Sequence, residues 1–136
     1  AYYIAAILRH FLSKNQSDAD TCKISFFANK TQIDTTALID SGNSLNDAFG
    51  MSDIIIADKK ICDNLFSSLS SDEKKSRYRA IPCNTVSGTE ILDGFRADKA
   101  VISSDSINTE LYRPIIAVSK TPMSSEAKAI INPRSI

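Results

Sequence analysis

Apolar and polar residues alternate along much of the chain, and the alternation begins after an N-terminal polar run. Every second position from Cys22 to Phe26 is apolar, which is typical of a strand with one buried face. A turn at 28–30 separates this strand from a second one at 31–39, which is rich in β-branched residues. The second strand ends in three apolar residues and breaks sharply at Asp40. The pattern therefore predicts a β-hairpin whose second strand delivers a carboxylate at its end.

Further short strands are predicted where apolar runs or alternating segments are bounded by turn residues. They are residues 54–56, 80–86, 89–95, 99–102 and 115–118. Ser87-Gly88, which lies between two of them, is typical of a β-hairpin turn. Pro82 restricts the first strand of that hairpin to the edge of a sheet, because proline has no N–H to donate.

Helical spacing of apolar residues predicts a helix within 59–69, and Ser71-Asp72-Glu73 resembles a cap that opens another helical turn. Ser124-Ser125-Glu126 also resembles a cap, so a final helix is expected to run to Ile131. About seven short strands with one or two helices are thus expected, at the turn spacing of a barrel or sandwich. The fold class is mainly β.

The N-terminal residues 1–20 are an apolar stub and a polar linker, and 21–136 form one domain. The apolar run at 1–8 is too short to span a bilayer, which needs about 20 residues. Two interpretations stay open. The stub is either an amphipathic helix that packs on its own domain, or the end of a transmembrane helix with Arg9 and Lys14 on the cytoplasmic side.

The composition argues against several classes of function. The chain has 136 residues, and its 16 basic side chains balance its 16 acidic ones, so nucleic acid is not an expected partner. Its 3 cysteines are widely spaced and form no CxxC pair, which fits a reducing compartment. With 1 histidine, a histidine triad or a multi-histidine metal site is not expected, and no cofactor is needed. Any catalysis would rest on carboxylates.

One short motif, Asp40-Ser41-Gly42-Asn43, carries the candidate chemistry. Taken alone it is a turn sequence, because Asp and Asn bond back to the backbone and glycine accepts positive φ. Its position directly after an apolar strand changes this interpretation, since the carboxylate then lies at the end of a buried strand. Aspartic proteases need two such carboxylates, one to activate water and one to polarise the scissile carbonyl.

The motif occurs once in the chain. Leu92-Asp93-Gly94 lacks the hydroxyl residue between Asp and Gly, so it is no second copy. A two-carboxylate site can then form only across a two-fold axis between two chains, as in retroviral-type proteases.

A longer segment, Asp40 to Asp47, resembles the Asp-Thr/Ser-Gly-Asn-x-Leu-x-Asp sequence of the sporulation sigma-E factor-processing peptidases. These are membrane-bound aspartic proteases of spore-forming bacteria. Other similar stretches are 54–56, 79–83, 92–95, 100–102, 114–118 and 129–133. The resemblance covers about residues 21–136, the soluble C-terminal half in that family, without the membrane-spanning N-terminal half.

The resemblance implies a pepsin/retropepsin-like, closed β-barrel-type domain with one or two short helices, which forms half of a two-fold homodimer. It implies that Asp40 of each subunit is catalytic and that Ser41, Gly42 and Asn43 scaffold the active-site loop. The implied reaction is removal of the N-terminal pro-segment of the sigma-E precursor. The implied location is the cell membrane, with this domain on the cytoplasmic side of the mother cell. A secreted signalling protein from the forespore is the implied activator.

Other residues have two interpretations each. Ser87 and Gly88 form either a flap that closes over substrate or an ordinary β-turn. Cys83 is interpreted as a buried structural thiol rather than a nucleophile, because His10 is distant in sequence. The basic run at 74–79 is a solvated face, with an acidic partner surface as the alternative.

Two rival functions remain at this point. The first is a catalytically silent domain of the same fold that serves dimerisation or peptide binding. The second is a cytoplasmic sensory or interaction domain of a membrane protein, in which Asp40 is only a turn residue.

Overall fold

Nine strands and two helices make up the part of the chain that the structure describes, namely residues 21–39, 54–85, 88–105, 108–123 and 126–131 of a computed structural model. The strands are β1 (Thr21–Ala28), β2 (Thr31–Ile39), β3 (Ile54–Ala57), β4 (Tyr78–Thr85), β5 (Gly88–Arg96), β6 (Lys99–Ser103), β7 (Asn108–Tyr112), β8 (Ile115–Val118) and β9 (Ala129–Ile131). The helices are α2 (Lys59–Leu65) and α3 (Ser71–Arg77). The mainly β class is confirmed.

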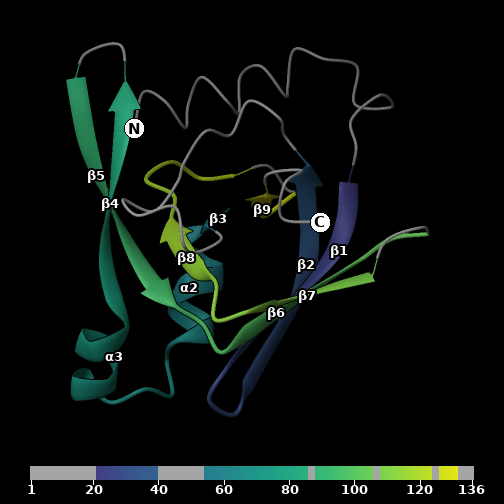
Figure 1. The fold of residues 1–136 in the computed structure, drawn as a ribbon, viewed down its shortest axis with the longest axis horizontal. Coiled ribbons are helices and arrows are strands. Elements are labelled where there is room, and N and C mark those ends of the chain that lie inside the picture. The colour runs from purple at the N-terminus through teal and green to yellow at the C-terminus, as the bar shows by residue number, and fades with distance from the viewer. Residues whose placement is uncertain (1–20, 40–53, 86–87, 106–107, 124–125, 132–136) are drawn as a thin grey trace.

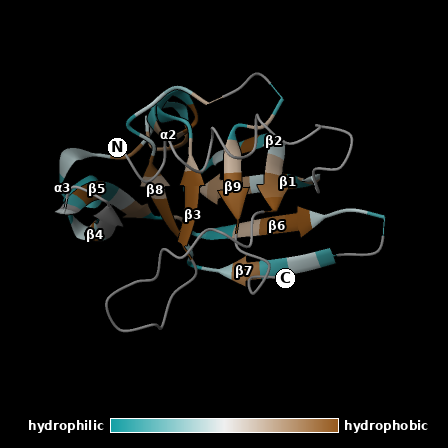
Figure 2. Ribbon diagram, turned by 90° about the horizontal axis from the view of Figure 1, so that it is seen from above, coloured by the Kyte–Doolittle hydropathy of each residue, from teal (hydrophilic) through white to brown (hydrophobic). Residues whose placement is uncertain are grey.

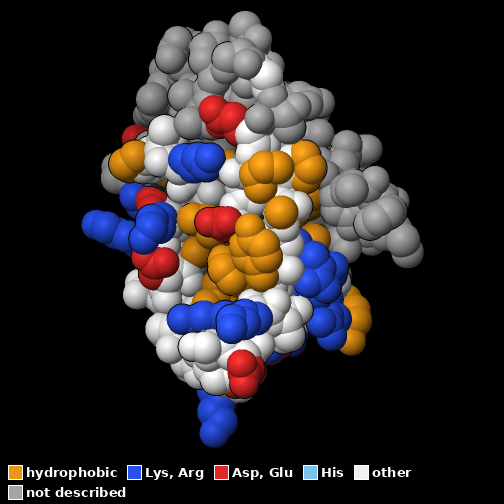
Figure 3. Space-filling model, turned by 90° about the vertical axis from the view of Figure 1, so that its left-hand side faces the viewer, with side chains coloured by type: hydrophobic (Ala, Val, Ile, Leu, Met, Phe, Trp, Pro, Cys, Tyr) orange, Lys and Arg blue, Asp and Glu red, His pale blue; other side chains and the backbone are white. Residues whose placement is uncertain are grey.

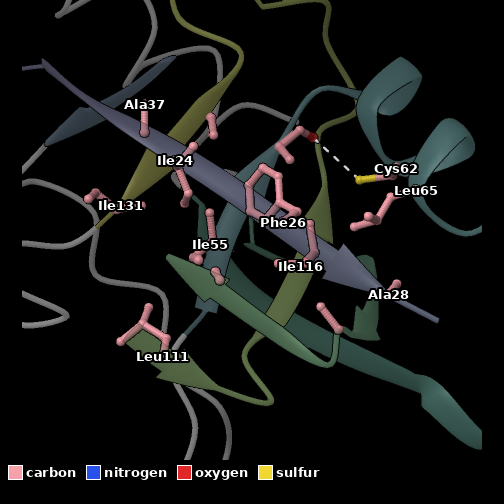
Figure 4. Packing of buried hydrophobic residues seen from close by; sticks show 14 of the residues in the cluster. Ile24, Phe26, Ala28, Ala37, Ile55, Cys62, Leu65, Leu111, Ile116 and Ile131 are labelled. Carbon is pink, nitrogen blue, oxygen red and sulfur yellow. Dashed lines mark hydrogen bonds between the residues drawn. The ribbon is translucent and has the colours of Figure 1, made fainter. Parts of the chain in front are cut away.

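All nine strands belong to one sheet with the order β4-β5-β8-β3-β9-β2-β1-β6-β7. The pairs β3·β8 and β2·β9 are parallel and the other neighbours are antiparallel (Figure 1). The expectation of a closed barrel is wrong for the described residues, because β4 and β7 end the sheet and do not pair with each other. The sheet folds over on itself instead, so that β1 crosses the central strands (Figure 4).

The β1–β2 hairpin matches the sequence prediction. Its inward residues Cys22, Ile24 and Phe26 are at most 5% exposed, and the strands pair in register from Thr21↔Leu38 onward. The turn is made possible by Asn29, whose φ of 54° lies in the left-handed region that asparagine tolerates.

The central strands β3, β8 and β9 are buried on both faces, and they are the hydrophobic strands of Figure 2. One face contributes to a core shared with β1, β6 and α2, which we call the β1-side core; its members include Ile24, Phe26, Ile55, Leu65, Ile116 and Ile131 (Figure 4). The other face contributes to a second core, which we call the hairpin-side core; it consists of Leu38, Ile54, Ile56, Ile81, Leu92, Ile115, Ala117, Met123, Ala127 and Ile130. Burial on both faces explains why the sequences of these short strands are continuous runs of apolar residues.

The two helices begin at well-formed caps. The Asp58 carboxylate accepts a hydrogen bond from the Lys60 N–H at the start of α2. At α3, Ser70 and Glu73 form a reciprocal capping box, so the helix starts close to the predicted cap. Neither helix has eight residues, and both depend on their packing against the sheet rather than on length.

In the C-terminal third one prediction is corrected and one further strand is found. The expected final helix is instead strand β9, because Ala129–Ile131 is fully buried between β2 and β3 and pairs with both. A short apolar run does not distinguish a helix from a strand. Here the run forms a strand that pairs with β2 on one side and with β3 on the other. Strand β7 was not predicted, since only its Leu111 is buried and its pattern is mostly polar.

The β4–β5 hairpin is confirmed, and Pro82 does lie in an edge strand. Its inward residues Ile81 and Leu92 are 2% and 0% exposed and join the hairpin-side core. Gly94 lets the hairpin base approach β8 closely, because a Cβ there would lie 2.9 Å from Ile115 Cγ2 and 3.1 Å from a backbone oxygen.

No helix among the residues described is long and apolar enough to cross a membrane.

Candidate active site

The strand that leads to Asp40 is held on both sides. β2 pairs with β1 from Thr31 to Leu38 and with β9 at its last three residues, where Ile39 lies beside Ile131. β9 in turn pairs with β3, antiparallel, so the start of β3 at Ile54 lies at the same end of the sheet as the end of β2. The strand that precedes Asp40 in the sequence is therefore held between β1 and β9 up to Leu38, and its last residue is held by β9.

Most of the predicted site residues lie outside the described residues: Asp40, Ser41, Gly42, Asn43 and Ser87. Their mutual geometry stays a prediction. Gly88, the remaining member, is exposed and has a φ of 132°, which L side chains rarely adopt. It closes the β4–β5 turn opposite Thr85, so this position requires glycine for the turn itself.

An apolar layer lies next to the end of β2. Leu38 belongs to the hairpin-side core together with Ile54 and Ile130 from the neighbouring strands, and with Ile81 and Leu92 from the β4–β5 hairpin. The hairpin and the strand that precedes Asp40 thus share one hydrophobic cluster. In Figure 1 the arrowheads of β2 and β4 both point to the top of the view.

The outer face of the same hairpin exposes two large hydrophobic side chains. Tyr78 and Ile91 are 39% and 49% exposed, and an apolar group surrounded by charged side chains is visible on this side of the molecule in Figure 3. The Tyr78 hydroxyl donates a 2.9 Å hydrogen bond to the Asp93 carboxylate, which raises the pKa of Tyr78. Asp93 is therefore bound to a tyrosine on the outer face of the hairpin.

The basic run is only partly a solvated face. Lys74 and Lys75 are exposed, as predicted. Arg77 is different, because its guanidinium binds both Asp98 Oδ1 at 2.9 Å and the Arg96 carbonyl at 3.1 Å. The sequence contained no signal that separated Arg77 from its neighbours.

Two buried polar residues that sequence reasoning did not single out have structural roles. Asp58 caps α2 and lies 3.7 Å from Lys128 Nζ. Ser119 accepts from the Thr121 N–H and donates to the Thr121 carbonyl, which fixes the turn after β8. An open hollow of about 490 Å³ between these residues has lysines and aspartates on its rim. Four of its charged residues form two ion pairs, Lys59 with Asp63 and Lys128 with Asp58.

The two cysteines whose side chains the structure describes are free and buried. Cys62 is 3% exposed, donates toward the Ala57 carbonyl and has its pKa raised to about 12, chiefly by desolvation. Burial also raises the pKa of Cys22. Cys83 lies in β4, and its side chain is outside the described residues.

We expect Cys22 and Cys62 to be unreactive toward a thiol reagent at neutral pH in the native protein, and fully reactive after unfolding. Reactivity requires the thiolate and access to it, and both thiols are buried with raised pKa values. Alkylation followed by peptide mass spectrometry, with and without denaturant, measures this for each cysteine. Rapid native labelling of Cys62 would contradict the packing of α2 described above.

The family model for peptidase family U4, described as sporulation factor SpoIIGA, matches residues 1–135. The chain belongs to this family. The match confirms the resemblance to the sigma-E factor-processing peptidases that the Asp40 segment indicated. No curated protein and no solved structure matched the chain. Membership in the SpoIIGA family makes the chain part of a sporulation peptidase and supports a hydrolytic function.

Proposed function

We propose that this chain is the protease domain of an aspartic endopeptidase that removes the N-terminal pro-segment of the sigma-E precursor. Asp40 from two subunits would form the catalytic pair, one carboxylate activating water and the other polarising the scissile carbonyl. Ser41, Gly42 and Asn43 would hold the two loops in place. No metal is required for this chemistry.

The observation that supports the proposal is the anchoring of the strand that precedes Asp40 in the sequence. β2 pairs with β1 up to Leu38 and with β9 up to Ile39. A catalytic carboxylate must be held to within a fraction of an ångström, and residues anchored on strands meet this requirement better than free loops.

The hairpin-side core connects the β4–β5 hairpin to the strand that precedes Asp40 in the sequence. It packs buried aliphatic side chains from β2, β3, β8, β9 and the β4–β5 hairpin into one cluster. Within this proposal the β4–β5 hairpin, with Ser87 and Gly88 at its tip, is the flap over the substrate.

The remaining parts of the proposal follow from the family. Residues 1–20 would connect a membrane-bound N-terminal half to the protease domain at 21–136. The domain would lie on the cytoplasmic side of the mother-cell membrane, where the sigma-E precursor is present. A secreted forespore protein would activate it through the membrane half.

The test is cleavage of the purified sigma-E precursor by membranes that contain the whole protein. We expect a single shorter product, with one new N-terminus identified by mass spectrometry. Membranes without the protein are the control. A precursor that stays intact in the presence of the activator, although the protein is folded, would favour the catalytically silent module.

A further inference from the structure

The β4–β5 hairpin joins the rest of the described sheet by strand pairing only near its base. β5 pairs with β8 through three residue pairs, the first of which is Gly94↔Ala117. The six residues of β5 before Gly94 pair with β4 alone. Ile81 and Leu92 pack into the hairpin-side core. The position of the hairpin therefore depends on this apolar packing and on the groups at its base.

Arg77 is placed at that base. It is the last residue of α3, and β4 begins at the next residue, Tyr78. Its guanidinium bridges two groups of the segment that joins β5 to β6, the Arg96 carbonyl at 3.1 Å and Asp98 Oδ1 at 2.9 Å. Both ends of the hairpin are thus connected by one side chain, which is only 19% exposed.

Asp98 is itself fixed to the body of the sheet. Its second carboxylate oxygen, Oδ2, accepts a 2.7 Å hydrogen bond from the Asn29 N–H in the β1–β2 turn. Its own N–H donates to the Phe27 carbonyl at 2.8 Å, and its carbonyl accepts from the Arg113 N–H at 3.0 Å. Asp98 therefore joins β1–β2, the β5–β6 connection and the end of β7, and it offers Arg77 an anchor with little freedom to move.

Aromatic packing completes the base. Phe95 lies 5.3 Å from Phe66 and 5.6 Å from Tyr78, measured between ring centroids. The Tyr78 ring meets the Phe95 ring edge-on, at 73°. These contacts resist separation of the hairpin from α2, and the charge-assisted hydrogen bond from Arg77 to Asp98 adds a directional contact at the base.

We propose that the Arg77–Asp98 pair is a clasp that sets the position of the β4–β5 hairpin, and that Arg77 is a positioning residue for the reaction proposed above. In that reaction the hairpin is the flap, so loosening its base would weaken substrate binding without touching the catalytic carboxylates. Both hydrogen bonds are donated by the Nη1 atom of the guanidinium, so Arg77→Lys, which keeps the charge and one nitrogen donor on a different stem, is expected to keep part of the clasp.

The first test measures the clasp without any activity. Hydrogen exchange with mass spectrometry is compared for the wild-type chain, Arg77→Gln and Arg77→Lys. We expect exchange in residues 88–96 to become about tenfold faster in Arg77→Gln and less so in Arg77→Lys, with residues 54–57 unchanged.

Lys59→Gln is the matched control. Lys59 also forms an ion pair with a carboxylate, Asp63 Oδ2 at 3.0 Å, but both side chains are more than 60% exposed and lie away from the hairpin. Its exchange pattern should equal that of the wild type. Unchanged exchange of 88–96 in Arg77→Gln would overturn the clasp, and so would equal acceleration throughout the sheet, which would indicate general destabilisation.

The second test uses cleavage of the sigma-E precursor by the whole protein. Arg77→Gln is expected to raise KM about tenfold with a smaller change in kcat, and Arg77→Lys should lie in between. An unchanged KM together with faster exchange would leave the clasp in place and remove its role in the reaction. If the wild type also fails to cleave, the proposed function fails, and the exchange experiment still decides whether the clasp exists.

Discussion

Replacement of Asp40 by asparagine is expected to abolish cleavage of the sigma-E precursor. The amide has nearly the same shape as the carboxylate, but it cannot accept the proton of the attacking water. General acid–base catalysis contributes about 10²–10⁴-fold to rate, so the loss should be at least of this size. Cleavage is measured as the amount of shortened product formed by membranes containing equal amounts of each variant.

Asp63→Asn is a suitable control for this experiment. Asp63 is an exposed carboxylate in α2 whose ion pair with Lys59 is at the surface, where such pairs contribute little to stability. The control should cleave at the wild-type rate. Removal of the Asp40 charge is expected to leave folding intact or to stabilise the dimer, because two close carboxylates repel each other. Normal cleavage by a folded Asp40→Asn protein would refute the aspartic protease mechanism.

Added Asp40→Ala chains are expected to inhibit the wild-type chain when both are dimeric. One Asp-Ser-Gly motif per chain supplies only half of the proposed site, so a mixed dimer holds a single carboxylate and is inactive. With random exchange, an equal amount of the variant should reduce wild-type activity to about half, and a threefold excess to about one quarter. The measurement is the initial rate at constant wild-type concentration.

The concentration dependence of activity provides an independent check. Association costs on the order of 4–15 kcal/mol of translational and rotational freedom, so the separate domain is expected to be largely monomeric at low concentration. In that range, doubling the chain concentration should raise the rate about fourfold, because active dimers form by mass action. Confinement to one membrane, or a fused dimerising domain ahead of residue 20, should raise the specific activity.

Sedimentation and a second addition distinguish the possible outcomes. An added excess of the Tyr112→Ser chain, which keeps Asp40 and changes an exposed side chain of β7, should raise the rate rather than lower it. A species that sediments as a monomer and cleaves at the full rate would show that the site does not need two chains.

Local pattern was sufficient for the hairpins. The alternation from Cys22 to Phe26 and the turn at Asn29 predicted β1–β2, and Ser87-Gly88 with Pro82 predicted β4–β5 and its place at an edge. These features depend on contacts between residues close in sequence, so a period of two and the turn chemistry of a few residues determine them. The family and the Asp40 motif were likewise identified from the sequence.

Only the tertiary structure decided the elements that depend on distant partners. Ala129–Ile131 forms a strand because it pairs with β2 on one side and with β3 on the other. Neither of these strands is close to it in sequence. The sheet formed by the described residues is open because β4 and β7 lie at its two edges and do not pair with each other; Pro82 predicted the edge position of β4, but no local pattern predicted β7 at the other edge. In the sequence, Arg77 does not differ from the other residues of its basic run. The folded chain places Asp98 2.9 Å from it. The sequence by itself determined the hairpins, the family and the motif that contains the candidate carboxylate, whereas long-range pairing decided which strands flank β2 and which arginine lies beside Asp98.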